Sequence, residues 1–183
     1  MHIVETCFGG HMKHSSLMTT SVLVLLLFPF TANASRISGQ PPCYSVRQTA
    51  VPIRVDGKSH SKEWKDATKI QLNYEIDPGE NIKPKVKTTA YLTYNRKNIY
   101  IAFVAEDPNP ASIRANLSDR DQAWRDDFVG IAIDPFNDNR RGYEFFVNPY
   151  GVQMDLKRVE GSGEDPSWDT IWDSAGSITK TGY

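Results

Sequence analysis

The sequence is poor in the residues on which much protein chemistry depends. Its 183 residues include two cysteines and four histidines, and beyond residue 34 only Cys43 and His60 remain. That part of the chain has too few such residues for an internal disulfide, a Cys/His zinc site or a thiol nucleophile with a choice of histidines. An intermolecular disulfide through Cys43 is the alternative that its lone thiol leaves open.

An excess of either charge is also lacking. Lysine and arginine number 21, aspartate and glutamate 22, and the formal net charge is −1. No basic cluster is interleaved with aromatic residues, as nucleic-acid recognition would require. We therefore expect no nucleic-acid partner.

Long apolar runs are rare, and the strongest one lies near the N-terminus. Residues 17–30 contain VLVLLLF, follow a weakly basic segment and lead to residues 31–34 (TANA), which have the small-x-small pattern of a signal-peptidase site. We predict a signal peptide at 1–34, with Met1 or Met12 as the start, and export to the periplasm, the outer membrane or the exterior. An uncleaved anchor is the alternative, although the run is shorter than the roughly 20 residues that span a bilayer.

The rest of the chain, 183 minus 34 residues, suits one domain with a core of its own. Residues 35–50 contain Pro, Gly and Ser without periodicity and are predicted to be a linker. Residues 51–183 are then the folded domain.

The start of this domain is predicted to hold one short strand and one short helix. Residues 52–58 form the strand, which ends in an Asp-Gly turn. Ser59 or Ser61 caps a helix over 62–67. Trp64 in this helix is expected to pack in the core, and a ligand platform is its alternative role.

Strand-like alternation of apolar residues dominates from residue 87 onward. Segments 87–94 and 98–106 form a hairpin, and the second has apolar residues on both faces, as in a strand buried between layers. Segments 128–133, 143–147 and 152–159 follow, joined by turn-forming residues. Short loops between successive strands predict an antiparallel meander.

The C-terminal stretch gives weaker signals. Residues 165–173 (DPSWDTIWD) place Trp168 and Trp172 beside aspartates, and this arrangement is typical either of a sugar platform or of a segment that closes one end of the sheets. A last weak strand is expected from Ala175. We find no closing strand before Tyr183, so we expect the domain to be C-terminally incomplete.

One segment has the composition of a sugar site. Sugars need flat aromatic faces and planar polar groups, and Trp124, Asp126 and Asp127 stand together with Arg125. Alternatively, the two acids flank the strand and pair with Arg120 or Arg125 in solvent.

No cofactor is indicated elsewhere, and the only metal candidate is calcium. Asp134, Asn137 and Asp138 have oxygen-rich spacing but lack the full EF-hand pattern. Asn116 begins a glycosylation sequon, a pattern too common to carry weight alone.

Several spaced motifs resemble the family 9 carbohydrate-binding module. They are, in chain order, 55–58 (VDGK), 92–103 (LTYNRKNIYIAF), 124–138 (WRDDFVGIAIDPFND) and 146–155 (FVNPYGVQMD). The sequence is most similar to the version found at the N-terminus of exported bacterial proteins with a predicted outer-membrane β-barrel. The resemblance implies an all-β fold, an antiparallel jelly-roll-like β-sandwich.

The resemblance also implies roles for individual residues. Trp124 matches the tryptophan that stacks on sugar in the family, and Asn148 matches the asparagine of the family's Val-Asn pair. Gly130 and Phe146 stand where the sugar-binding members have a glutamate and an arginine. The implied ligand residues are thus Trp124 and Asn148, beside the candidates Asp126, Asp127, Trp168 and Trp172 named above.

We therefore expect a non-catalytic module that binds a glycan or polysaccharide weakly through an aromatic platform. A structural or docking module for a following outer-membrane barrel is the first alternative. The second is an accessory part of a glycoside hydrolase, a reaction that needs two acids about 5–10 Å apart. The sequence contains many acids but gives no means of choosing such a pair.

Overall fold

The structure is a computed structural model that describes residues 42–60, 62–75 and 82–183. The predicted signal peptide lies outside these residues, as do residues 35–41 of the predicted linker. In the described part of the chain, no helix has the length and apolar character needed to cross a membrane.

The first sheet is built around β3 (Lys87–Tyr94), which pairs antiparallel with β4 (Ile99–Glu106) on one side. The other side of β3 pairs antiparallel with β2 (Thr68–Leu72) and, near its end, parallel with the two-residue β1 (Arg47–Gln48). The β3–β4 hairpin was predicted and is confirmed. Asn95 closes it, because its side-chain oxygen accepts hydrogen bonds from the backbone N–H groups of Lys97 and Asn98.

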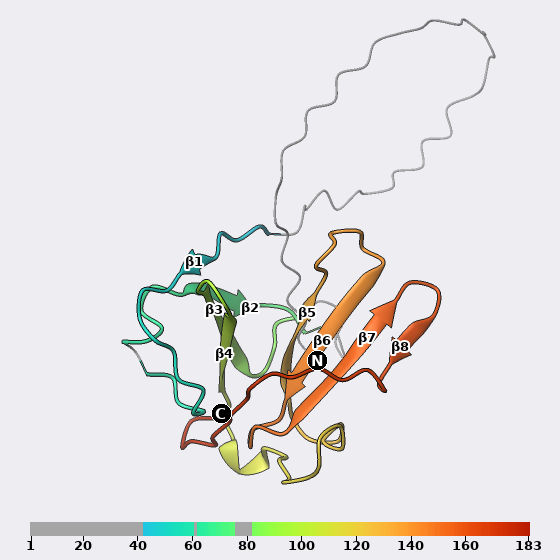
Figure 1. The fold of residues 1–183 in the computed structure, drawn as a ribbon. Helices are drawn as coiled ribbons and strands as arrows, with labels where there is room; N and C mark the ends of the chain where they lie inside the picture. The colour runs from blue at the N-terminus through green and yellow to red at the C-terminus, as the bar shows by residue number, and fades with distance from the viewer. Residues whose placement is uncertain (1–41, 61, 76–81) are drawn as a thin grey trace, which may run out of the picture.

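The second sheet is an antiparallel meander of four strands in chain order (Figure 1). It contains β5 (Val129–Ile133), β6 (Arg141–Val147), β7 (Gln153–Val159) and the short β8 (Gly163–Asp165). The three long strands match the predicted meander. Strand β8 was not predicted.

The two sheets face each other across an apolar core. Ile70, Leu92 and their neighbours on the first sheet contact Ile131 of β5, and Phe103 and Phe145 pack around them. Sequence alternation accounts for this, because Ile131 and Phe145 are directly paired residues on one face of the second sheet. The predicted all-β sandwich is confirmed, and the one helical segment described is the 3₁₀ turn η1 (Pro110–Ser112).

A second apolar cluster covers the outer face of the second sheet. Its strand residues point away from the first sheet and are Phe146, Met154 and Leu156. Ala123 and Phe128, from the segment before β5, pack against them. Adjacent residues of a strand face opposite sides of the sheet. Phe145 of β6 therefore packs in the core between the sheets, and Phe146 packs in the second cluster.

Two elements that were predicted at the start of the domain are absent. Residues 52–58 form no strand, and residues 62–67 form separate turns rather than a helix. Six residues are too few for a helix that no packing partner holds along its length. Trp64 is nevertheless buried and packs against Tyr91 with 6.5 Å between ring centroids, as the core hypothesis requires.

From Ala175 onward the chain forms no strand and makes only isolated bridges, Thr179 with Gly182 and Gly182 with Glu106. At the other end, Tyr44 and Val46 pack on the core, so the folded unit includes residues that were predicted to be linker. Strand β4 is partly rather than fully buried, because a cleft, described below, runs along it.

Candidate functional site

Trp124 lies at the surface on a base of two other aromatic rings. Its side chain is 38% exposed. Its ring centroid lies 5.6 Å from that of Phe146 and 6.1 Å from that of Phe128, both in edge-to-face geometry. Phe128 and Phe146 contact each other at 5.5 Å, so Trp124 is held on two sides.

Gly130 explains how Phe146 fits beneath this platform. The two residues are directly opposite in the β5–β6 pair, and a Cβ atom added at Gly130 would overlap Cδ1 of the Phe146 ring. The ring thus fills the space that a side chain at Gly130 would occupy. The two positions that carry charged sugar contacts in the resemblance form one apolar unit here.

Asp126 and Asn148 form a buried polar network next to the platform. Asp126 Oδ2 accepts hydrogen bonds from the backbone N–H of Asn116 and from Nδ2 of Asn148, both at 2.8 Å, and Oδ1 accepts one from Nδ2 of Asn116 at 2.7 Å. Burial acts to raise the pKa of Asp126, but these hydrogen bonds together lower it below its usual value.

Asn148 uses all of its hydrogen-bonding groups inside the protein. Its Nδ2 also donates to the Asn116 carbonyl at 2.8 Å, and its Oδ1 accepts from the backbone N–H groups of Tyr150 and Val152. The side chain is 1% exposed. Asn148 therefore shapes the turn after β6 and ties it to the loop at Asn116.

Asp127 is the more accessible acid of the pair. Its carboxylate accepts hydrogen bonds from the backbone N–H and the guanidinium of Arg114, both at 3.0 Å, and its side chain is 30% exposed. This arrangement corresponds to the alternative in which the acid pairs with an arginine, although the partner is Arg114 rather than Arg120 or Arg125.

Trp168 and Trp172 lie together, but on the opposite face of the second sheet from Trp124. Their ring centroids are 6.1 and 5.6 Å from that of Phe145, and Trp168 also packs on Tyr143 at 4.7 Å. Packing on the inward side chains of β6 corresponds to the closure hypothesis. The predicted ligand residues are therefore divided between two separate places.

A cleft of about 940 Å³ follows β4 and is also lined by residues of β5 and β6. Its lining includes Ile101 of β4 and Val129 of β5, together with Ile53, Trp64 and Trp172 from the loops. Trp172 Nε1 is buried and has no hydrogen-bond partner among the described residues. The cleft was not predicted, because strands and loops far apart in the sequence form it together.

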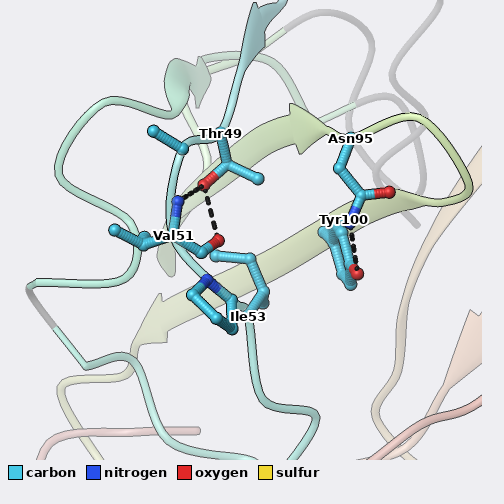
Figure 2. A pocket seen from close by; sticks show the side chains of 7 residues that line it. Thr49, Val51, Ile53, Asn95 and Tyr100 are labelled. Carbon is cyan, nitrogen blue, oxygen red and sulfur yellow. Dashed lines mark hydrogen bonds between the residues drawn. The ribbon is translucent and has the colours of Figure 1, made fainter.

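A smaller cavity of about 310 Å³ lies between residues 49–53 and the β3–β4 turn (Figure 2). Asn95 Nδ2 donates to the Tyr100 hydroxyl at 3.0 Å, and Thr49 Oγ1 donates to the Val51 carbonyl at 2.9 Å. Each side of the cavity thus has polar groups that are hydrogen-bonded within that side.

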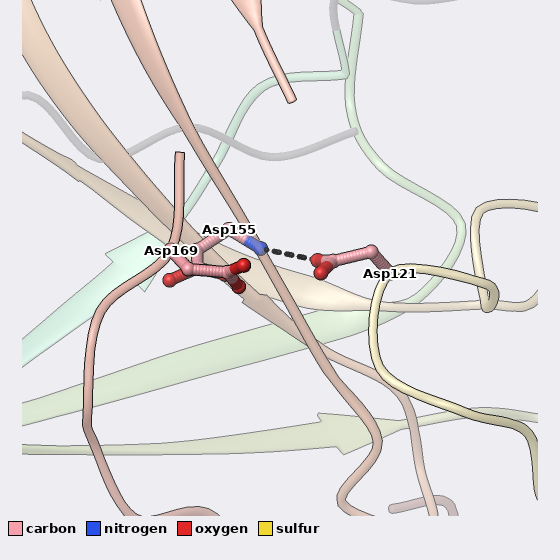
Figure 3. A group of neighbouring side chains, drawn as sticks. All are labelled: Asp121, Asp155 and Asp169. Carbon is pink, nitrogen blue, oxygen red and sulfur yellow. Dashed lines mark hydrogen bonds between the residues drawn. The ribbon is translucent and has the colours of Figure 1, made fainter. Parts of the chain in front are cut away.

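Arg120 is surrounded by the carboxylates of Asp121, Asp155 and Asp169, which Figure 3 shows converging from three segments. Its Nη2 contacts both carboxylate oxygens of the fully buried Asp155 at 2.5 Å, and its Nε lies 3.0 Å from Asp169. Hydrogen bonding to Asp155 raises the pKa of Arg120. The guanidinium is the cation at the centre of this acidic group.

The predicted calcium candidates organise a turn. Asp134 accepts hydrogen bonds from the backbone N–H groups of Phe136 and Asn139. Asp138 pairs with the Arg141 guanidinium at 2.8 Å, which lowers the pKa of Asp138. Asn137, between them, adopts a left-handed φ of 51°. Calcium binding by these residues stays a prediction.

Comparison with known families decides what this sandwich is. A family model described as "Carbohydrate family 9 binding domain-like" matches residues 55–183. The chain belongs to this family. Comparisons with curated proteins and with solved structures each found no match. The family 9-like domain is a binding module rather than a catalytic one, and it carries Trp124 at its surface with Gly130 and Phe146 packed together beneath.

Proposed function

We propose that this family 9-like domain binds glycans weakly through Trp124. The observation that carries the proposal is an exposed indole held in a fixed orientation by Phe128 and Phe146. A ring that is already immobilised loses little conformational entropy when the apolar face of a sugar stacks on it. Membership in a carbohydrate-binding family supports glycan as the ligand.

The polar contacts near Trp124 are few, and this sets the affinity. Asp126 and Asn148 are saturated by internal hydrogen bonds, which leaves Asp127 and the exposed Arg125 at the rim. Because Phe146 offers no charged group, we expect millimolar to high-micromolar dissociation constants and a preference for glycans with apolar faces.

The predicted signal peptide supports export, so we place the module in an exported bacterial envelope protein, acting on glycans outside the cytoplasm. A structural or docking module for a following outer-membrane barrel is the second candidate. The apolar cleft along β4 favours it, because a wall of aliphatic side chains suits polypeptide better than a hydroxylated sugar.

The test is a glycan array followed by calorimetry on the wild-type chain and on Trp124→Ala. Stacking on a sugar is worth about 1–2 kcal/mol, so the variant should bind roughly ten-fold more weakly. Leu117→Ala is the matched control, because Leu117 is an apolar side chain of the neighbouring loop that is 81% exposed and should leave binding unchanged. Circular dichroism checks that all three proteins are folded. Undiminished binding by Trp124→Ala would contradict the proposal.

A further inference from the structure

A charged group lies on the same face of the second sheet as Trp124. Phe146, which lies 5.6 Å from the Trp124 ring, and Glu144 are alternate residues of β6, so both face outward. Glu144 is paired with Leu156 of β7. Arg158 lies two residues further along β7 and therefore faces outward as well. The aromatic platform and the Glu144–Arg158 pair thus belong to one surface.

Arg158 is an exposed cation that two acids hold in place. Its Nη2 donates a hydrogen bond to Oε1 of Glu164 at 2.8 Å, and its Nε lies 3.6 Å from Oε1 of Glu144. The Arg158 side chain is 55% exposed, whereas that of Glu144 is only 4% exposed. Burial raises the pKa of Glu144, and the attraction of Arg158 opposes this shift. Because a guanidinium has several N–H donors, these two contacts leave others directed to solvent.

The surface beside Arg158 has room for a ligand. Gly142 lies directly opposite Arg158 in the β6–β7 pair, and paired residues face the same side of a sheet. Among the described residues, a Cβ atom added at Gly142 would meet only the Ile133 carbonyl oxygen, at 3.9 Å. A planar group of hydrogen-bond donors therefore borders an open patch, which is what recognition of sugar hydroxyl groups requires.

The spacing between the platform and Arg158 favours a ligand longer than one sugar. Met154 of β7 lies opposite Phe146, and Arg158 is four residues further along the strand. Each strand residue adds about 3.3 Å, so the two points lie about 13 Å apart along β7. A single sugar ring stacked on Trp124 does not span this separation, whereas a short oligosaccharide laid along the sheet does.

The charges of this group favour a neutral ligand. The carboxylates of Glu144 and Glu164 surround the single guanidinium of Arg158, so the group has no excess positive charge. An anionic sugar would bring a like charge to these carboxylates, which is unfavourable. A neutral hydroxyl group can accept a hydrogen bond from Arg158 and donate one to Glu164, whose side chain is 47% exposed.

We propose that Arg158 is a second glycan contact of this domain, which binds the hydroxyl groups of a neutral oligosaccharide while another ring of the same chain stacks on Trp124. The inference rests on the function proposed above and adds the residue that determines the preference for longer glycans. Glu144 and Glu164 position the guanidinium, and the open patch at Gly142 receives the distal ring.

Calorimetry on the full chain with glucose and with cellohexaose tests the proposal. Cellohexaose is a linear, neutral hexamer of glucose, and the flat apolar faces of its rings suit stacking on Trp124. The wild type should bind cellohexaose more tightly than glucose. Arg158→Ala should weaken cellohexaose binding roughly ten-fold, because a hydrogen bond to a charged group is lost, and should leave glucose binding unchanged.

Two controls accompany this variant. Lys87→Ala removes a similarly exposed, ion-paired cation from the first sheet and should leave the binding of both sugars unchanged. Removal of Arg158 alone leaves the buried Glu144 without its partner, so circular dichroism must show that the variant is folded. The double variant Glu144→Gln, Arg158→Gln leaves no unpaired buried charge and should show the same loss of cellohexaose binding.

Trp124→Ala separates a failure of this inference from a failure of the proposed function. Equal affinity of the wild type for the two sugars would overturn the inference, and so would a preference for cellohexaose that survives in the Arg158 variants. If Trp124→Ala still weakened binding in either case, the platform itself would stand. Binding of both sugars that is untouched by Trp124→Ala, or no binding by the wild type, would overturn the platform and the second contact together.

Discussion

Replacement of Arg120 by alanine should destabilise the domain more than the loss of any exposed ion pair. Arg120 is the cation that faces Asp155, which is fully buried in β7, and their closest contact is 2.5 Å. Removal of one partner from a buried pair costs about 3–5 kcal/mol, because the other charge stays buried without compensation. The Arg120 side chain is 32% exposed and water can reach the vacated space, so we expect about 3 kcal/mol, the lower end of that range.

Urea unfolding at neutral pH measures the effect, read as a shift of the midpoint at constant slope. Lys87→Ala is the control, because Lys87 pairs with Glu106 at 2.7 Å while both side chains are at least half exposed. It should cost less than about 1 kcal/mol. The double variant Arg120→Met, Asp155→Leu should recover much of the loss, since it leaves no buried charge. A cost for Arg120→Ala no larger than that for Lys87→Ala would refute this account.

Two further predictions concern the platform and the network beside it. Gly130→Ala should lower the free energy of unfolding by about 1–3 kcal/mol, because the new methyl group overlaps Phe146. In the control Gly142→Ala the methyl group meets only a carbonyl oxygen at 3.9 Å, so the stability should be nearly unchanged. Thermal unfolding compares the two variants, and equal melting curves would contradict the packing argument. Burial acts to raise the pKa of Asp126, but hydrogen bonds from Asn148 and Asn116 lower it below its usual value. The ionised carboxylate therefore contributes its full stabilisation above the unfolded pKa of about 4. This contribution is lost as the pH falls through the folded pKa. The stability difference between the wild type and Asp126→Asn should therefore shrink in urea titrations below about pH 4; a difference that stays constant with pH would show that the carboxylate charge is not involved.

The strands that local pattern specifies were predictable from the sequence. The β3–β4 hairpin and the β5–β7 meander have alternating apolar residues and turns with Asn, Pro and Gly, so local conformation and tertiary packing agree. Strand β2 has only five residues and was missed. Its position depends on pairing with β3, which is a long-range contact that no local pattern encodes.

The candidate site was predictable only in part. Trp124 could be found because its motif and neighbouring acids are contiguous. The saturation of Asn148 could not, because two of its four hydrogen bonds involve residues 22 and 32 positions away. Arg120 was considered only as a solvent partner for local acids, whereas its main partner lies 35 positions away on β7. Sequence gives the residue types of such a network, while the fold decides whether they face a ligand or each other.

The opposite orientations of Phe145 and Phe146 separate the aromatic platform from the cleft along β4. Phe146 supports Trp124 on the outer face of the second sheet, and Phe145 faces the core, with Trp172 at the cleft. Gly130 and Phe146 replace polar sugar contacts by a rigid apolar base. Binding at Trp124 should therefore depend on how firmly that base is held.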